Sequence, residues 1–326
     1  MKYEKLGHTE IKVSKLAVGC MSMGEASTMH DWTLNATDSE ILVKKALDHG
    51  INFFDTANIY SRGTSETFLG RAIKNNVARE KVVLASKVYF NDFNFTTNSG
   101  NLSKEQILRE IDGTLARLQT DYLDLYIIHR FDNSTAIEET MEVLNSLVKS
   151  GKVRALGASA MYGYQFHNMQ HVALQHHWTL FASMQNHYNL LYREDERELI
   201  PICKQYSVSL TPYSPLAAGR LSRLQWHANT KRSQTDQIAV SKYDSTEKED
   251  YKIVKRVHEL AEKRGATMSQ ISLAWHFAKG VTSPIIGATQ ATYLDDAVGA
   301  LNIHLTREEV DDLEALYRPH QIVGAL

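Results

Sequence analysis

The sequence predicts an α/β fold in which eight parallel strands close into a (β/α)8 TIM barrel. Two observations support this fold class. Short apolar runs alternate with helical segments from about residue 15 to residue 300, and eight such runs occur. Such runs are typical of parallel strands, because both faces of each strand are buried. The alternative is an open doubly wound sheet, but no Gly-x-Gly-x-x-Gly turn follows an early strand.

The strand and helix candidates follow one another along the chain. The expected strands are residues 16–19, 51–54, 82–85, 123–128, 153–158, 180–185, 208–212 and 283–286. The expected helices are residues 38–49, 65–75, 103–118, 136–149, 162–175, 194–205, 251–264 and 269–279. Capping residues support these bounds, since Gly50 and Gly151 stand at C-cap positions and Ser103 with Gln106 forms a capping box.

Three segments lie outside the repeated strand and helix units. Residues 2–13 are expected to form a β-hairpin that closes the barrel floor, with Gly7-His8-Thr9 as its turn. Residues 306–316 have the pattern of an extra C-terminal amphipathic helix. Residues 217–248 form the longest irregular stretch, which is typical of a binding loop or lid.

Composition indicates a globular enzyme-sized chain rather than a nucleic-acid or membrane protein. The 326 residues have 43% apolar and 23% charged content and a formal net charge of −2, with no basic block. No linker composition divides the chain, so residues 1–326 are expected to form a single domain. Cys20 and Cys203 are far apart and are expected to be buried thiols, and no secretory signal or membrane span is recognisable. We therefore expect a cytoplasmic protein.

Four polar residues stand at or just past the ends of three predicted strands: Asp55, Tyr60, Lys87 and His129. In a closed parallel barrel the carboxyl ends of the strands meet at one rim, where such proteins carry out their chemistry. A phenol, an ammonium, an imidazole and a carboxylate at this rim suit carbonyl reduction by hydride, since the substrate oxygen must receive a proton.

Each of these residues has an expected role. Lys87 is expected to lower the pKa of Tyr60 by opposite charge, and Asp55 to pair with Lys87. Tyr60 then donates the proton, and His129 hydrogen-bonds the substrate oxygen. Taken singly, an aspartate at a strand end is often a helix cap, and a tyrosine is often packing. The convergence of all four on one rim favours the catalytic interpretation.

Several motifs resemble the aldo-keto reductases. The segments Phe54-Asp55-Thr56-Ala57-Asn58-Ile59-Tyr60, Leu84-Ala85-Ser86-Lys87 and Asp124-Leu125-Tyr126-Ile127-Ile128-His129 are similar to motifs of the family's second, third and fourth strands. Ile128-His129-Arg130 and Met184-Gln185-Asn186-His187-Tyr188-Asn189 resemble the branch of bacterial general-stress-protein reductases and potassium-channel β-subunits. The resemblance implies that Asp55, Tyr60, Lys87 and His129 are the catalytic tetrad, with Tyr60 as general acid.

The resemblance also implies a nicotinamide site at the strand ends. Ser159 and Gln185 match residues that hold the carboxamide, Tyr213 matches an aromatic that stacks on the nicotinamide, and Gly19 and Met21 would lie beneath the ring. The remaining residues implied in cofactor binding are Asp55, Ser214, Pro215, Leu216, Gly219, Ile286 and Gly287.

The adenosine end departs from the family pattern. The family's polar positions after the last strand read Thr289, Tyr293, Asp296 and Ala297 in this chain. Thr289 is placed to bind a phosphate at a helix N-terminus, Tyr293 to stack on adenine, and Asp296 to accept from the adenine amino group, whereas Ala297 loses a polar contact. The expectation of NADPH (NADP+) rather than NADH therefore rests on basic residues after strand seven, namely Arg220, Arg223 and Arg232.

The substrate pocket is expected to be lined by Trp32, Tyr89, Arg130, Phe131 and His187, together with Tyr60 and His129. The substrate is expected to be a small-molecule carbonyl compound, and Arg130, directly after His129, suggests tolerance for an anionic or polar one. The alternative is that Arg130 pairs with Asp132. His167 and His171 have metal-ligand spacing, but no third ligand accompanies them, so no metal is expected.

Two rival functions stay open at this point. A cofactor-binding regulatory protein could keep the same fold with little turnover, and a lyase could use Lys87 as a Schiff-base nucleophile. The sequence leaves the oligomeric state open.

Overall fold

Eight parallel strands form a single curved sheet in the computed structural model, which describes residues 1–323 apart from 27, 29, 92–98 and 228. Their order across the sheet is β10-β3-β4-β5-β6-β7-β8-β9. Their bounds are β3 Ala17–Gly19, β4 Phe53–Asp55, β5 Val83–Val88, β6 Leu123–Ile128, β7 Val153–Ser159, β8 Phe181–Gln185, β9 Ser209–Leu210 and β10 Ile285–Gly287. The eight expected strands are all present, so the parallel α/β prediction is confirmed.

Backbone hydrogen bonds bring the two ends of the sheet together. The amide of Ile285 in β10 donates to the carbonyl of Pro212, just past β9, at 2.9 Å. The amides of Thr282 and Ser283 both donate to the carbonyl of Leu210, at 3.1 and 3.3 Å. The eighth strand therefore meets the seventh, and the sheet closes in the manner of a (β/α)8 barrel.

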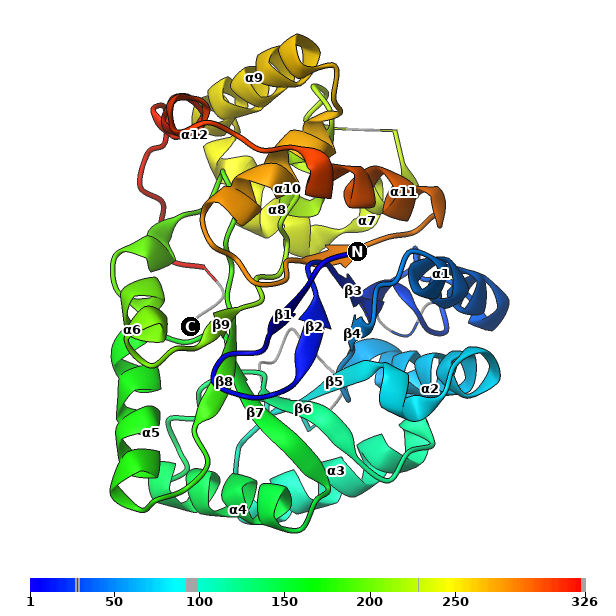
Figure 1. Ribbon diagram of the computed structural model, residues 1–326, viewed down its shortest axis with the longest axis vertical. Helices are drawn as coiled ribbons and strands as arrows, with labels where there is room; N and C mark the ends of the chain where they lie inside the picture. Colours follow the sequence, from blue (N-terminus) through cyan, green and yellow to red (C-terminus); the bar gives the residue numbers. More distant parts are fainter. Residues whose placement is uncertain (27, 29, 92–98, 228, 324–326) are drawn as a thin grey trace.

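Helices cover the outer face of the sheet, with the strands at the centre (Figure 1). The helices before β9 are α1 Ala36–Asp48, α2 Thr64–Asn76, α3 Lys104–Leu118, α4 Ile137–Lys149, α5 Gly163–Gln175 and α6 Leu199–Gln205. The later helices are α7 Lys231–Thr235, α8 Gln237–Tyr243, α9 Glu247–Arg264, α10 Met268–Ala278, α11 Thr292–Gly299 and α12 Arg307–Glu314. Asn35 caps α1 and Ser103 caps α3 through side-chain oxygens, so both helices begin where a capping residue stands.

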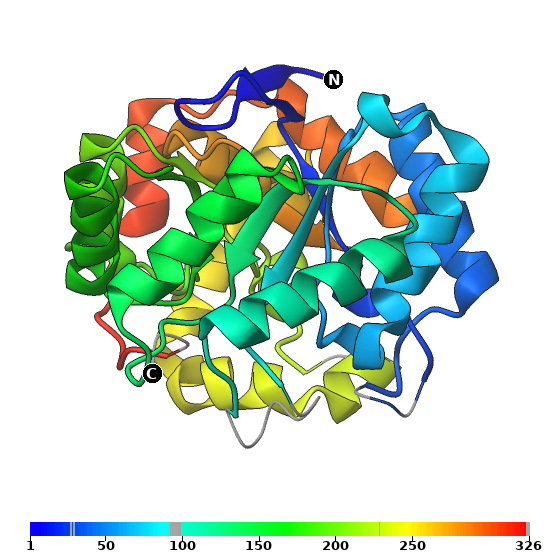
Figure 2. The ribbon, with the colours of Figure 1, turned by 90° about the horizontal axis from the view of Figure 1, so that it is seen from below.

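The N-terminal hairpin closes one end of the barrel, as expected. β1 (Tyr3–Lys5) pairs antiparallel with β2 (Lys12–Ser14), and Figure 2 shows this hairpin at the opposite end from the segment that contains α7 and α8. Between the two strands, Leu6 is fully buried, and the Gly7 amide donates to Ser209 Oγ at 2.7 Å. A Cβ on Gly7 would lie 2.3 Å from the Ala182 carbonyl oxygen, so only glycine permits this approach.

Alternate residues of each strand point to opposite sides of the barrel wall. The inner cluster takes one or two apolar side chains from each strand except β9 and is closed at the floor by Leu6 and Val13: Ala17, Phe53, Val83, Ala85, Leu125, Ile127, Ala155, Ala182 and Ile285. Because side chains alternate with a period of two, the next inward positions after Phe53, Ala85, Ile127 and Gly157 are Asp55, Lys87, His129 and Ser159. The alternation of side chains along each strand therefore places these polar side chains at the rim.

The segment of residues 217–248 is more regular than the sequence predicts. It contains a 3-10 turn at Ala217–Ser222, the five-residue helix α7 and the seven-residue helix α8. Asp236 accepts from the amide of Ala239 and caps α8. The prediction of an irregular loop was therefore wrong here, because helices of one or two turns leave no periodic signal.

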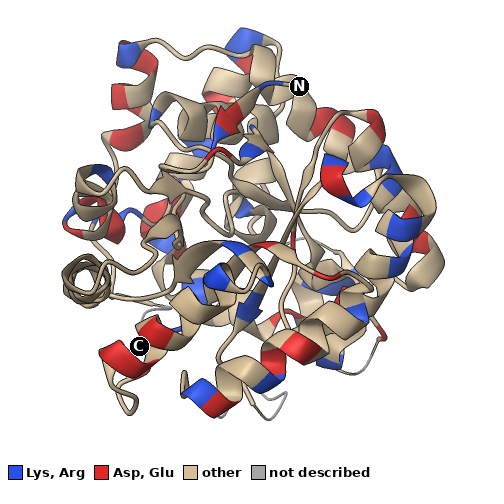
Figure 3. Ribbon diagram, turned by 60° about the horizontal axis from the view of Figure 1, so that its bottom comes forward, with Lys and Arg blue, Asp and Glu red and all other residues tan. Residues whose placement is uncertain are grey.

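Charged residues of both signs are distributed over the outer helices (Figure 3). Cys20 and Cys203 are buried free thiols, as expected. Among the helices of the described ranges, none combines the length and apolar character that a membrane crossing requires.

Candidate active site

Asp55, Tyr60, Lys87 and His129 come together at one end of the barrel. The Lys87 ammonium is fully buried and donates to Asp55 Oδ1 at 2.6 Å, to the Thr56 carbonyl at 2.8 Å and to the Tyr60 hydroxyl at 3.3 Å. The Tyr60 and His129 rings meet edge to face with their centres 5.9 Å apart. The sequence-predicted group of four is therefore one contiguous cluster around the phenol.

The loop after β4 holds the Tyr60 ring in place. It continues along β5, since the Thr56 amide donates to the Ala85 carbonyl at 2.9 Å and the Asn58 side chain donates to the Phe90 carbonyl at 3.1 Å. Just beyond Tyr60, Ser61 and Arg62 have left-handed φ values of 45° and 55°. Non-glycine residues rarely adopt this conformation, and it concentrates at functional sites where the surroundings enforce it.

Burial dominates the electrostatics of the three groups around Lys87. Burial raises the pKa of the Asp55 carboxyl even though Lys87 opposes it. Burial works to lower the pKa of Lys87, but Asp55 and Tyr60 outweigh it, so the pKa of Lys87 is raised and the ammonium keeps its proton.

The expected direction of the Tyr60 shift is wrong. Burial raises the pKa of the Tyr60 phenol, and the attraction of Lys87 only partly offsets this because the charge of Asp55 acts against it. The phenol is therefore protonated throughout the neutral range.

His129 is neutral in this setting. Burial lowers the pKa of its imidazole well below the usual value, and the positive charges of Lys87, Arg130 and Lys242 lower it further. A neutral imidazole keeps one N–H donor for a carbonyl oxygen, which fits the role that the sequence suggests.

Gln185 and Ser159 extend the cluster along the rim. Gln185 Nε2 donates to Asp55 Oδ2 at 2.9 Å, so Asp55 is bound on both oxygens. The Ser159 hydroxyl donates to the Gln185 backbone carbonyl at 2.8 Å. The structure thus brings these two residues to the tetrad, while their contact with a carboxamide stays a prediction.

Tyr213 is supported by a stack of aromatic rings. Its ring lies parallel to His187 with centres 5.1 Å apart, and His187 stacks in turn on Tyr192 at 4.1 Å. His187 Nε2 is 2.7 Å from the Tyr243 hydroxyl. Burial lowers the pKa of His187 well below its usual value, so this imidazole is a neutral packing element. His187, predicted as a pocket residue, therefore supports Tyr213 from behind.

Sequence reasoning missed Asn189 and Tyr243. Asn189 Nδ2 donates to the Ser214 carbonyl at 2.9 Å and to the Tyr243 hydroxyl at 3.1 Å, which fixes the chain at Ser214, Pro215 and Leu216. Asn189 lies inside the Met184–Asn189 motif, which was the signal that could have found it. Tyr243 lies at the end of α8, where no motif marks it.

The ends of β3 and β10 form a close-packed base beside the tetrad. Gly19 pairs with Gly287, and a Cβ on Gly19 would lie 2.8 Å from Ile285 Cγ2, so the two strands approach through glycine. Ile286 is buried, and Met21 is partly buried in the turn after β3. These predicted cofactor residues share one side of the rim.

The three arginines predicted to bind a phosphate differ in their partners. Arg220 is buried, pairs with Asp244 and lies over the rings of Trp226 and Tyr243. Arg232 pairs with Asp236 at 3.1 Å. The guanidinium groups of Arg220 and Arg232 are therefore already engaged by carboxylates.

Arg223 is the exception in this group. It has no ion pair among the residues that the structure describes, and its Nε atom is buried without a hydrogen-bond partner there. Burial and the charges of Arg220 and Arg232 lower its pKa. Gly219, at φ 94°, makes room for it, since a Cβ there would lie 2.8 Å from Arg223 Nη1. An anion would satisfy this site.

The residues after β10 are only partly gathered around Arg223. Tyr293 on α11 is 50% exposed and close enough to Arg223 to influence its pKa. Asp296 accepts from the Thr267 hydroxyl at 2.8 Å, and Thr267 caps α10, so this carboxylate is engaged with a neighbouring helix. Thr289 lies in the turn before α11.

The predicted substrate residues fall into two groups. Tyr89 and Arg130 lie near the tetrad, since Tyr89 packs edge to face on Phe90 and Phe90 packs on His129 with centres 5.1 Å apart. Trp32, by contrast, is stacked between His30 and Arg232, with the Arg232 guanidinium 4.4 Å from its ring centre. Trp32 thus joins the loop after β3 to α7.

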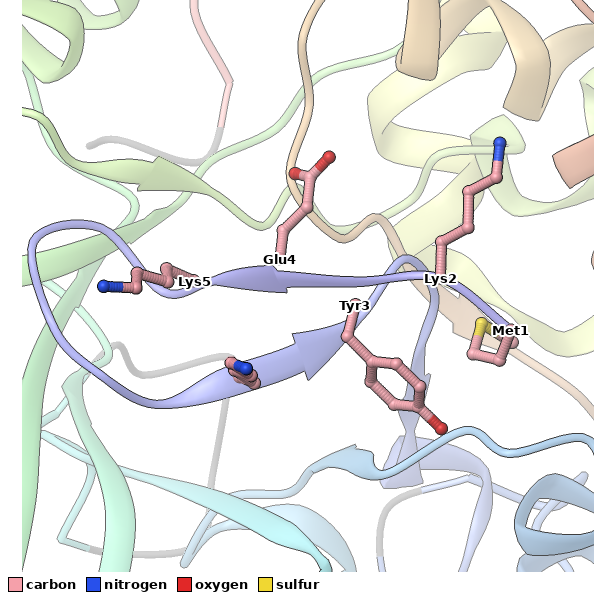
Figure 4. A pocket seen from close by; sticks show the side chains of 6 residues that line it. Met1, Lys2, Tyr3, Glu4 and Lys5 are labelled. Carbon is pink, nitrogen blue, oxygen red and sulfur yellow. The ribbon is translucent and has the colours of Figure 1, made fainter.

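Other candidate sites carry less chemistry. Within the described ranges no group of three potential ligands is arranged to hold a metal, and His167 instead lies 3.1 Å from the Tyr206 hydroxyl. The hollow in Figure 4 lies against the N-terminal hairpin, where Met1, Lys2, Tyr3, Glu4 and Lys5 surround an open surface at the far end from the tetrad. The rim that holds Tyr60 is therefore the candidate active site.

A closed parallel barrel with a buried Asp-Tyr-Lys-His cluster at the carboxyl ends of its strands defines an oxidoreductase of the aldo-keto reductase class. Residues 15–318 match the Aldo/keto reductase family, and the chain belongs to that family.

Similar proteins come from fungi and yeast. The chain is 40% identical to an aldo-keto reductase of Fusarium vanettenii, over 99% of this chain and 92% of that protein. It is 39% identical to the versiconal hemiacetal acetate reductase of Aspergillus parasiticus, over 99% and 98%. It is also 39% identical to a candidate aryl-alcohol dehydrogenase of Schizosaccharomyces pombe, over 99% and 98%. The family generally uses a nicotinamide cofactor and acts on small-molecule carbonyl compounds.

Proposed function

We propose that this enzyme reduces aldehydes or ketones to alcohols with NADPH, and that Tyr60 is the general acid. The observation that carries the proposal is the hydrogen-bonded chain from Asp55 through Lys87 to the Tyr60 hydroxyl, with links of 2.6 and 3.3 Å. In this arrangement the phenol can give up its proton, and the anchored ammonium beside it stabilises the phenolate that results.

The residues of this chain divide the work of proton delivery. When bound, the nicotinamide supplies the hydride. Tyr60 holds the proton on its hydroxyl and donates it to the substrate oxygen, which becomes a stronger base than a phenolate as negative charge develops on it. Lys87 then stabilises the Tyr60 phenolate, and Asp55 keeps Lys87 in position. His129, held neutral, orients the carbonyl oxygen by donating a hydrogen bond.

The rim residues are chemically fitted to hold a nicotinamide. Gln185 and Ser159 would bind the carboxamide, Tyr213 would stack on the ring, and Gly19 and Gly287 would provide a base without side chains. These assignments combine the family resemblance with the positions of the residues around Asp55.

NADPH is proposed over NADH because Arg223 is a partly buried cation without a carboxylate partner among the described residues. A guanidinium binds phosphate through two hydrogen bonds, and the 2′-phosphate distinguishes the two cofactors. Tyr293 beside Arg223 is placed to cover the adenine.

The test compares Arg223→Met with the unchanged enzyme for both cofactors. The expected result is a Kd for NADPH that rises by about 10- to 100-fold, since hydrogen bonds to a charged group contribute about 1.5–3 kcal/mol. The Kd for NADH should change little. Arg109→Met, in which an exposed arginine of α3 is replaced, is the matched control. Equal losses for both cofactors would overturn the assignment of Arg223 to the 2′-phosphate.

The two rival functions fit the site less well. A Schiff base requires a neutral amine, whereas the Lys87 ammonium is ion-paired and its pKa is raised. Borohydride should therefore trap no adduct at Lys87. A regulatory protein without turnover would bind NADPH and reduce no aldehyde, so NADPH consumption measured by absorbance with a panel of aldehydes separates it from the reductase.

A further inference from the structure

Arg130 lies at the mouth of the barrel, and among the described residues no carboxylate pairs with it. It directly follows His129 at the end of β6, and it makes no ion pair or hydrogen bond with any residue in the described part of the chain. Its Nε and Nη1 atoms are buried there without partners. A partly buried, unsatisfied guanidinium is costly unless an anion completes it.

The nearest candidate partner in the sequence, Asp132, is engaged elsewhere. Its carboxylate accepts from the Leu102 amide at 2.7 Å, from the Ser134 amide at 2.8 Å and from the hydroxyls of Ser134 and Thr135, both at 2.6 Å. These bonds shape the turn after β6 and use both carboxylate oxygens. The alternative of an Arg130–Asp132 pair is therefore removed.

A second cation lies beside Tyr213 at the same rim. Lys242 of α8 is half-buried, and its Nζ atom is 4.4 Å from the Tyr213 ring centre and 3.4 Å from the Tyr213 hydroxyl. No described carboxylate forms an ion pair with it, since Asp236 is paired with Arg232. Burial, followed by the charge of Arg130, lowers the pKa of Lys242 to about 7.

Both cations border the rim that holds His129, since Arg130 directly follows His129 and Lys242 lies over the Tyr213 ring. Arg130 and Lys242 each contribute to lowering the pKa of His129, and Arg130 also acts on the phenols of Tyr89 and Tyr213. These effects place the two charges near the aromatic residues that surround the catalytic imidazole. The positive potential is therefore concentrated where a substrate would bind.

The phosphates of a cofactor do not account for these charges. In the closed sheet β6 is four strands from β10 in either direction, so Arg130 stands across the barrel from Gly287. The proposed phosphate site, Arg223 with Tyr293, belongs to the β10 side. We therefore assign the anion that completes Arg130 to the substrate, and Lys242, beside Tyr213, adds positive charge to the same rim.

We propose that Arg130 and Lys242 form a subsite for a carboxylate on the carbonyl substrate, so that the enzyme prefers aldehydes or ketones that carry a carboxylate. The inference rests on the proposed reductase function. Arg130 binds one or both carboxylate oxygens, Lys242 adds a second positive charge, and the carbonyl group reaches Tyr60 and His129.

The test uses two substrates of nearly equal shape, 4-carboxybenzaldehyde and its methyl ester. With NADPH, kcat/KM should be higher for the carboxylate by about 10-fold or more. In Arg130→Met the ratio of the two kcat/KM values should fall by about 10- to 100-fold, and in Lys242→Met by a smaller factor. Arg109→Met should leave the ratio unchanged.

A binding measurement separates this inference from the proposed function. Benzoate and benzamide cannot be reduced, so their binding to the enzyme with NADP+ does not depend on turnover. Benzoate should bind more tightly than benzamide, and Arg130→Met should remove most of the difference. Reduction of both aldehydes at equal kcat/KM, with equal binding of benzoate and benzamide, would overturn the carboxylate subsite and leave the reductase intact. Preferential benzoate binding without reduction of either aldehyde would support the subsite and overturn the proposed function.

Discussion

Replacing Tyr60 with phenylalanine removes the proposed proton donor and little else. The ring stays in its buried position and keeps its edge contact with His129. Lys87 loses the 3.3 Å hydrogen bond to the phenol but keeps its bonds to Asp55 at 2.6 Å and to the Thr56 carbonyl at 2.8 Å. The ammonium therefore remains anchored, and the stability change should be within about 1 kcal/mol.

The expected kinetic effect is much larger than the effect on stability. A positioned general acid contributes about 10²- to 10⁴-fold to the rate, which corresponds to about 2.7–5.4 kcal/mol in the activation barrier. Because the phenol of Tyr60 is protonated throughout the neutral range, the whole enzyme population loses its donor. We expect kcat to fall by this factor while the Kd for NADPH stays within about twofold.

The assay follows nicotinamide absorbance with benzaldehyde at saturating NADPH, and cofactor fluorescence reports binding separately. Tyr89→Phe is the matched control, since this second buried tyrosine lies near His129 but makes no bond to Lys87. A loss of kcat smaller than about tenfold in Tyr60→Phe would refute the role of this phenol as the acid. An equal loss in Tyr89→Phe would indicate a general effect on the pocket.

Two further predictions concern the charges around the site. Lys87→Met leaves the Asp55 carboxylate buried without its cation and should lower the free energy of unfolding by about 3–5 kcal/mol. Adding Asp55→Asn to the Lys87→Met variant should restore part of this loss. Urea unfolding measures both, and additive losses in the double variant would contradict the coupling. Lys242 is charged below its pKa of about 7 and neutral above it, so benzoate affinity should fall as pH rises through about 7. Besides burial, the neighbouring Arg130 lowers the pKa of Lys242 and Asp236 raises it. The slope should disappear in Lys242→Met, and a persisting slope would assign the titration to another group.

Much of the barrel can be predicted from local signals. The apolar runs and capping residues such as Ser103 identify the strands and helices, since each element carries its own pattern. The sequence does not predict the helices α7 and α8, because they have five and seven residues, too few to show a helical period. Their positions depend on contacts such as Arg232 with Trp32, which join segments far apart in the sequence.

The candidate site shows the same division. Asp55, Lys87 and His129 are predictable because strand ends share one rim. Lys242 is not, because α8 brings it to Tyr213 only in the folded chain. The direction in which the pKa of Tyr60 shifts was also not predictable, since the sequence shows the neighbouring lysine but not the depth of burial, which outweighs its effect.

The join between β9 and β10 has a consequence for how long the enzyme survives without its cofactor. β9 has only two residues, and a few amides, those of Thr282, Ser283 and Ile285, close the cylinder. Local opening starts where backbone hydrogen bonds are few, so β9 and β10 should separate before other strand pairs of the barrel. A nicotinamide bound across Tyr213 and Gly287, as proposed, would bridge this line and favour the closed form by mass action. Proteolytic lifetime in the cell would then follow the supply of cofactor, and starvation for it would shorten the life of the protein.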